Sequence, residues 1–142
     1  MITQTVCTSF KSGLLKGEHD LSTDTIKLAL YTSSAALSST TTAYSVTDEI
    51  SGTGYVAGGA TLSGVSISTS GEVAYVDWSD AVFSSADFSP LLARGALIYN
   101  DTHASDASIC VLDFGVDKVT TGADFTIEFP ANNSSDAVLR IT

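Results

Sequence analysis

The sequence predicts an all-β protein: a single-domain antiparallel β-sandwich or jelly-roll-like barrel over residues 1–142, with one short N-terminal helical turn. The length suits one domain. Only 15% of the residues are charged, and abundant Ser, Thr, Val and Gly favour strands and turns over long solvated helices. About eight to ten short apolar runs are separated by turn residues, a pattern typical of sandwiches and barrels.

The most apolar part of the chain is a pair of runs, Ala93–Asn100 and Ser108–Gly115, joined by polar residues. Two such runs around a short polar loop predict a β-hairpin. Neither run alternates cleanly between apolar and polar residues, so we expect both faces of each strand to be covered. The hairpin is therefore expected in the middle of the sheet system.

The N-terminal part of the chain predicts two strands and a short helix. Thr3–Thr8 is a candidate first strand. Phe10 and Leu14 stand four residues apart and predict one or two helical turns that end at Gly17. Thr25–Tyr31 alternates between large apolar and other residues and predicts a strand.

Two segments without clear periodicity follow. Ser33–Tyr44 is a low-complexity Ser/Thr/Ala run with few large apolar residues, which predicts a surface loop with a helical turn at Ala35–Leu37. Gly52–Gly59 has the spacing G-x-G-x-x-x-G but no Walker lysine, and it opens no helix. We therefore expect a strand with glycine bulges there, and not a phosphate-binding loop.

The rest of the chain predicts further short strands. The candidates are Leu62–Ile67, Glu72–Trp78, Asp124–Phe129 and Ala137–Ile141, with Trp78 in the core. Asp80–Pro90 shows a mixed pattern and Asp117–Ala123 reads as a connection.

Charge and cysteine content limit the possible partners and environments. The formal net charge is −10, and the six basic residues are scattered singly. Nucleic-acid binding requires clustered Lys and Arg, so nucleic acid is not an expected partner. Cys7 and Cys110 are far apart in sequence and are expected as buried free thiols. Residues 1–4 do not resemble a signal peptide and no apolar run reaches the length of a membrane span, so we expect no membrane partner.

The sequence contains no recognisable catalytic or metal-binding pattern. His19 and His103 are the two histidines, both in predicted loops, and no G-x-S-x-G elbow is present. Asp113, Asp117 and Asp124 match no calcium-loop spacing. We expect a protein that is not an enzyme and that uses neither a cofactor nor a metal.

Several stretches, taken in order, carry a resemblance to a known family. They are Phe10–His19 (FKSGLLKGEH), Asp24–Tyr31 (DTIKLALY), Gly52–Leu62 (GTGYVAGGATL), Ala93–Asn100 (ARGALIYN), Val111–Lys118 (VLDFGVDK) and the ending Phe125–Ile141 (FTIEFPANNSSDAVLRI). Through them the chain resembles a family of small virion proteins of tailed bacteriophages. None of these stretches is a catalytic motif, so the resemblance lies in their order and joint presence.

The resemblance implies a protein that is made in the host bacterial cytoplasm and is present in many copies on the virion. We expect a capsid decoration, or cement, protein that is commonly a homotrimer, binds the major capsid protein and stabilises the outside of the head shell. A tail or neck position is the alternative, with the chain as a tube, adaptor or baseplate ring subunit. A host-surface or carbohydrate-binding β-sandwich is a third possibility, with Tyr44, Tyr55 or Trp78 as its aromatic platform.

Predicted exposure alone indicates the residues that we expect at an interface. They are Phe10, Leu14, Ala35, Leu37, Tyr44, Tyr55, Asp101 and His103. The polar Ser33–Tyr44 loop is expected to lie across a neighbouring protein and to order on binding.

Overall fold

The structure, a computed structural model, describes all 142 residues and contains ten strands and one helix. The elements are β1 (Thr5–Val6), α1 (Thr8–Lys16), β2 (Ile26–Tyr31), β3 (Ala60–Thr61), β4 (Ser66–Ser70), β5 (Val73–Asp77), β6 (Ala81–Asp87), β7 (Ala93–Asn100), β8 (Ala107–Lys118), β9 (Thr121–Ile127) and β10 (Leu139–Ile141). All strand pairs are antiparallel. The predicted all-β class is confirmed, and the sheets form no closed barrel. The single helix, α1, has nine residues, too few to span a bilayer.

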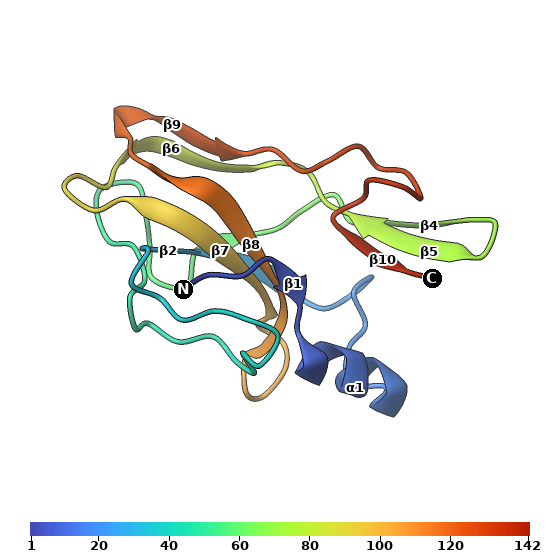
Figure 1. The fold of residues 1–142 in the computed structure, drawn as a ribbon. Helices are drawn as coiled ribbons and strands as arrows, with labels where there is room; N and C mark the ends of the chain where they lie inside the picture. Colours follow the sequence, from blue (N-terminus) through green and yellow to red (C-terminus); the bar gives the residue numbers. More distant parts are fainter.

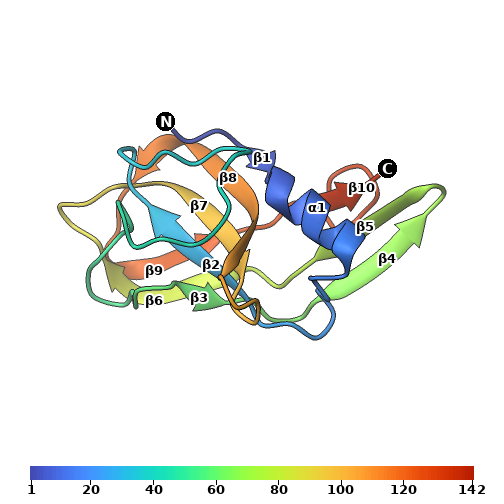
Figure 2. The same ribbon diagram turned by 90° about the horizontal axis from the view of Figure 1, so that it is seen from below.

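Three sheets share one hydrophobic core. The main sheet has the order β1-β8-β7-β2-β3, and the β6–β9 ribbon lies over one of its faces, so these two sheets form the layers of a sandwich (Figures 1 and 2). The third sheet, β10-β5-β4, stands beside the sandwich next to α1 (Figure 1). We call this third sheet the side sheet.

The central hairpin is confirmed as β7 and β8. The two strands pair from Asn100↔Ala107 to Ala93↔Lys118, and β2 pairs along the other edge of β7. Leu97 and Ile98 are fully buried, as expected for a strand that is covered on both faces. The hairpin therefore lies in the interior of the main sheet.

The predicted N-terminal helix is also confirmed, with the predicted end. Gly17 adopts the left-handed conformation (φ 72°), and its N–H donates to the carbonyl of Leu14. The next N–H, of Glu18, donates to the carbonyl of Gly13. These two bonds satisfy carbonyls that the last helical turn leaves free, which is why a glycine ends the helix here.

The Ser33–Tyr44 loop differs from the prediction, because it is fixed to the body of the protein. It has no helical turn at Ala35–Leu37. The N–H of Thr3 donates to the backbone carbonyl of Leu37 (2.9 Å), and the N–H of Tyr44 donates to the backbone carbonyl of Asp106 (2.9 Å). The small residue Ala35 and the large residue Leu37 are both buried. These backbone bonds with distant segments left no periodic signal in the sequence.

Gly52–Gly59 forms consecutive turns, so the predicted strand is wrong. Gly59 has φ +81°, and a Cβ on it would lie 1.9 Å from the carbonyl oxygen of Leu28 in β2. The glycine therefore marks a close approach between a turn and a strand. Only the two residues of β3 pair with β2 afterwards.

Asp80–Pro90, where the sequence shows a mixed pattern of apolar and polar residues, contains the seven-residue strand β6. Ala81 and Phe83 are buried in alternation, and Ser85 then has a positive φ of 49° within an irregular register. This bulge returns Ala86 to the core and breaks the period of two, which hid the strand in the sequence. The Asp117–Ala123 connection is shorter than expected, because β8 reaches Lys118 and β9 begins at Thr121.

Candidate functional site

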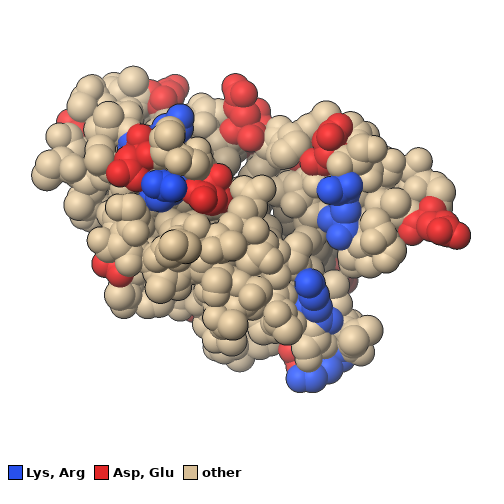
Figure 3. Space-filling view, in the orientation of Figure 1, with Lys and Arg blue, Asp and Glu red and all other residues tan.

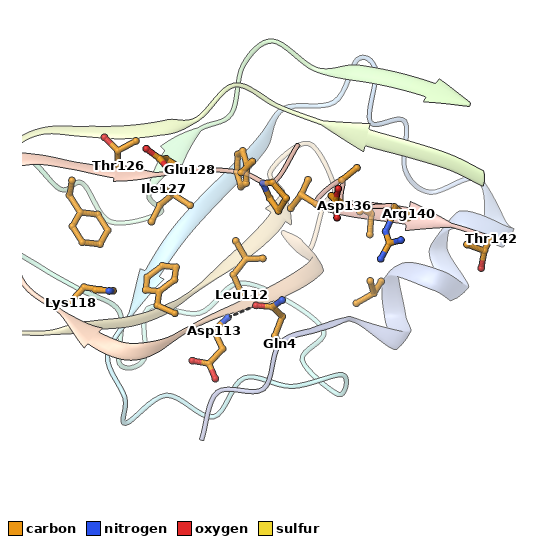
Figure 4. Close-up of a pocket in the computed structure, with 18 residues that line it drawn as sticks. Gln4, Leu112, Asp113, Lys118, Thr126, Ile127, Glu128, Asp136, Arg140 and Thr142 are labelled. Atoms are coloured by element: carbon orange, nitrogen blue, oxygen red, sulfur yellow. Dashed lines mark hydrogen bonds between the residues drawn. The ribbon is translucent and has the colours of Figure 1, made fainter. Parts of the chain in front are cut away.

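A groove of about 770 Å³ lies on the open side of the sandwich (Figure 4). One wall comes from β1 and β8, and the other comes from β9 and the segment that leads into β10. We call it the interlayer groove. In Figure 3 most of this face carries no charged side chain, and the acidic and basic groups that are present lie close to one another on either side of the hollow.

Aromatic side chains form much of the interlayer groove. Phe114 from β8, Phe125 from β9 and Phe129 are each half-buried and line the groove. The rings of Phe114 and Phe125 are 6.4 Å apart, and Phe125 also packs on buried Phe88 at 5.4 Å. We call Phe114, Phe125 and Phe129 the aromatic strip. Its inner side packs on the core, while part of each ring stays accessible.

The carboxylate of Asp113, on the polar rim of the interlayer groove, is held in place by hydrogen bonds. The Asp113 carboxylate accepts a hydrogen bond from the N–H of Gly115 (2.9 Å) and one from Arg94 Nε (3.1 Å). The Gly115 N–H, followed by the Arg94 side chain, holds the pKa of Asp113 below its usual range. Gln4 Oε1 accepts from the backbone N–H of Asp113 (3.2 Å) and joins β1 to β8 (Figure 4).

Two cations on the same rim have no carboxylate partner. Lys118 and Arg140 line the groove, and neither lies within salt-bridge distance of an acidic side chain. Arg140 donates only to the carbonyl of Ser134, at 3.3 Å. The chain as a whole has a net charge of −10, yet these two cationic groups have no acidic partner within it. They are therefore available to pair with a carboxylate of another protein.

A second, smaller groove of about 460 Å³ separates α1 from the side sheet. We call it the helix groove. Phe10 and Leu14 line it from α1, and Ile67, Val76 and Leu139 form a paired row on the facing side sheet. Nine of its 12 lining residues are hydrophobic, so this groove is the more apolar of the two.

A cluster of polar rings closes one end of the helix groove. His19 packs on Phe10 (4.9 Å between ring centroids) and stacks on His103 (5.5 Å). The buried amide of Asn100 lies 3.0 Å from His19 Nδ1 and donates to Asp24 at 2.7 Å. Burial, and then the neighbouring His103, lower the pKa of His19 below 6.5.

This pKa shift predicts a loss of stability in mild acid. Between the lowered pKa and 6.5 the unfolded chain binds more protons at His19 than the folded chain does, so stability falls as the pH falls through this window. We expect the melting temperature to drop between pH 7 and pH 5, and the drop to be smaller in His19→Gln, which keeps an acceptor for Asn100. Asp20 and Asp113 titrate below 3.8, outside this window. Thermal melting at each pH measures the effect. If the melting temperature of His19→Gln fell between pH 7 and pH 5 as much as that of the unmodified protein, His19 would not be the group responsible.

The tyrosines named as a possible carbohydrate platform have an internal structural role. Tyr55 donates to Glu49 Oε1 (2.6 Å) and accepts from the N–H of Leu30 (2.9 Å), and burial followed by Glu49 raises its pKa. Tyr44 donates to Glu49 Oε2 (2.7 Å) and stacks on Tyr99 at 4.8 Å. Tyr55 is only 8% exposed and Trp78 3%. The exposure on which the carbohydrate alternative depended is therefore absent for both.

The eight predicted interface residues are spread over several places. Four are buried, so the expectation that they are exposed is wrong: Phe10, Ala35, Leu37 and Tyr55. Their side chains fill the core. A single sequence does not distinguish an apolar residue of the core from one of an exposed apolar patch. Leu14 is half-buried in the helix groove, and Tyr44 is half-buried against Tyr99. Asp101 pairs with Lys27 (3.3 Å), and His103 lies 3.8 Å from Glu18.

The predicted interface includes none of the residues that line the interlayer groove. Phe125 and Phe129 lie in the predicted strand Asp124–Phe129, which was not expected to form an interface, and Phe114 lies in a run expected to be covered on both faces. All three are half-exposed, because the main sheet ends at the two-residue strand β1, the ribbon ends at β9, and no strand connects these two edges. A missing neighbouring strand leaves no local signal in either flanking sequence.

The two cysteines and the three aspartates that were considered as possible metal ligands each have a local structural environment that involves no metal site. Cys7 and Cys110 are free and buried, as predicted, and burial raises the pKa of Cys110 to about 12. Asp113 and Asp117 both lie beside Arg94, whereas Asp124 accepts from the N–H of Ser85 (2.8 Å). No three metal-ligating side chains come together.

Comparisons with protein families, with curated proteins and with solved structures found no match for this chain.

Proposed function

We propose that this chain is a structural protein of a tailed-bacteriophage virion, a capsid decoration protein that docks on the outside of the head shell through the interlayer groove. The observation that carries the proposal is the half-exposed aromatic strip of the groove beside two cations without partners. A contiguous exposed apolar surface with a polar rim is typical of a protein–protein contact site.

The stretches that resemble phage virion proteins also supply this groove. Val111–Lys118 and Phe125–Ile141 contain every residue that lines the groove except Gln4, Val6 and Thr142. The motif Phe10–His19 likewise supplies Phe10 and Leu14 of α1, together with Gly17 and His19, to the helix groove. The resemblance and the concave surfaces therefore involve the same elements.

The partner that fits is a segment of the major capsid protein that carries an apolar side chain and a nearby carboxylate. The apolar side chain would pack against Phe114, Phe125 and Phe129, and the carboxylate would pair with Lys118 or Arg140. The net charge of −10 suits an outer head surface better than a surface that faces packaged DNA.

The test compares two variants of β8 in binding to heads that lack this protein. Phe114→Ser removes a ring from the groove, whereas Val116→Ser, the matched control, changes an exposed side chain that does not line it. We expect at least a tenfold loss of affinity for heads in Phe114→Ser and little change in Val116→Ser, because a central aromatic contact is typically worth about 2 kcal/mol or more.

Folding of both variants is checked by circular dichroism and thermal melting before binding is measured. Equal head binding by folded Phe114→Ser and by the unmodified protein would rule out the interlayer groove as the docking site. Binding of the unmodified protein to isolated tails instead of heads would favour the tail or neck alternative.

A further inference from the structure

The side sheet ends in an unprotected edge strand. In the order β10-β5-β4, β4 pairs with β5 on one side and has no strand on the other. Figures 1 and 2 both show the β4–β5 hairpin projecting from the body, with the outer side of β4 uncovered. The outward backbone N–H and C=O groups of β4 are therefore available to another strand.

β4 differs from the other edge strands by its lack of charge. Its sequence is Ser66-Ile67-Ser68-Thr69-Ser70. Edge strands in the other positions are either only two residues long, as β1 and β3 are, or carry a charged residue: Asp87 in β6, Asp124 in β9 and Arg140 in β10. Charged residues, prolines and bulges are the usual protection of an edge against strand pairing, and β4 has none of them.

The two faces of β4 have opposite character. Ile67 and Thr69 lie on the apolar face of the side sheet, in register with Val76 and Ala74 of β5. Ser66, Ser68 and Ser70 lie on the polar face. Ile67 is 54% exposed at the open end of the helix groove, so the apolar face continues to the free edge.

We propose that β4 is a self-association edge, which pairs antiparallel with β4 of a second copy around a two-fold axis to make a six-stranded sheet. A second copy fits because a charge-free strand meets itself without like-charge repulsion, even though each chain has a net charge of −10. The contact is isologous, since each strand presents the same groups to the other.

The alternation of β4 selects the register. An antiparallel pair keeps the two apolar faces on one side only if residues of the same parity lie opposite each other. Among the two-fold registers that do so, the one centred on Ser68 pairs all five residues. It places Ser68 opposite Ser68, and Ile67 opposite Thr69, so each Ile67 gains a neighbour across the new interface.

The first experiment is oxidative cross-linking of Ser68→Cys, with Ser12→Cys on the exposed surface of α1 as the matched control. Cys7 and Cys110 are buried, so the introduced thiol is the reactive one. We expect Ser68→Cys to form a covalent dimer readily and Ser12→Cys to remain largely monomeric. Equal cross-linking of the two variants would contradict the proposed register.

The second experiment measures mass by native mass spectrometry and light scattering from micromolar to millimolar protein. We expect a dimer for the unmodified chain and a monomer for Ser68→Lys, because two lysines would then face each other on the axis. A monomer throughout, a trimer, or a dimer that Ser68→Lys leaves intact would overturn the proposal. The measurement uses the purified protein alone and is independent of capsid docking.

Discussion

Replacing Glu49 with alanine is expected to lower the free energy of unfolding by about 3 kcal/mol or more. The Glu49 carboxylate accepts from Tyr44 (2.7 Å), from Tyr55 (2.6 Å) and from the N–H of Gly58 (2.8 Å). Each buried donor that loses its acceptor costs roughly 1–3 kcal/mol. These bonds also hold the turns around Gly58 on β2, so their loss affects the packing of the whole segment.

Urea unfolding measures this loss against a matched carboxylate, Glu72, which is exposed at the tip of the β4–β5 hairpin and makes no ion pair. Glu72→Ala is expected to change stability by less than about 0.5 kcal/mol, as is usual for surface positions. Equal stabilities of the two variants would show that the tyrosine–carboxylate network does not anchor the loop.

Replacing Gly59 with alanine is expected to cost more than about 4 kcal/mol or to prevent folding, an effect that only a few mechanisms produce. The new Cβ would lie 1.9 Å from the carbonyl oxygen of Leu28 and 2.7 Å from the Cα of Ala29. Both atoms belong to the backbone of the buried strand β2, which has little freedom to move. The left-handed φ of +81° adds backbone strain.

Gly71→Ala is the control for this prediction, because Gly71 has φ +60° and no atom within 4 Å of its added Cβ. It carries the conformational strain without the clash and is expected to cost about 1–2 kcal/mol. If both variants lost the same stability in urea unfolding, the close approach between Gly59 and β2 would not be a real constraint.

Local patterns in the sequence predicted the elements that depend on local physics. The paired apolar runs gave β7 and β8, and the spacing of Phe10, Leu14 and Gly17 gave α1 with its correct end. The sequence did not reveal β6, because the bulge at Ser85 breaks its alternation. Nor did it reveal the anchoring of residues 33–44, which depends on backbone bonds between distant segments.

The candidate site was less predictable than the fold. Of the residues expected at an interface, Phe10 and Leu14 line the helix groove, but Ala35, Leu37 and Tyr55 are part of the core. The interlayer groove exists because two layers stay open beside β8 and β9, and that openness is a property of the tertiary arrangement. Composition indicated an acidic protein of few charges, and only the structure locates Lys118 and Arg140 beside the aromatic strip.

The proposed function places the protein on a phage particle, and the most direct test is to localise it on intact virions purified from the source of this sequence. Gold-labelled antibody against this chain would be viewed by electron microscopy, with virions that lack the protein as the control. We expect gold distributed over the whole head surface. Gold confined to the tail or neck, or particles without gold although the protein is present in the preparation, would contradict a decoration protein docked on the outside of the head.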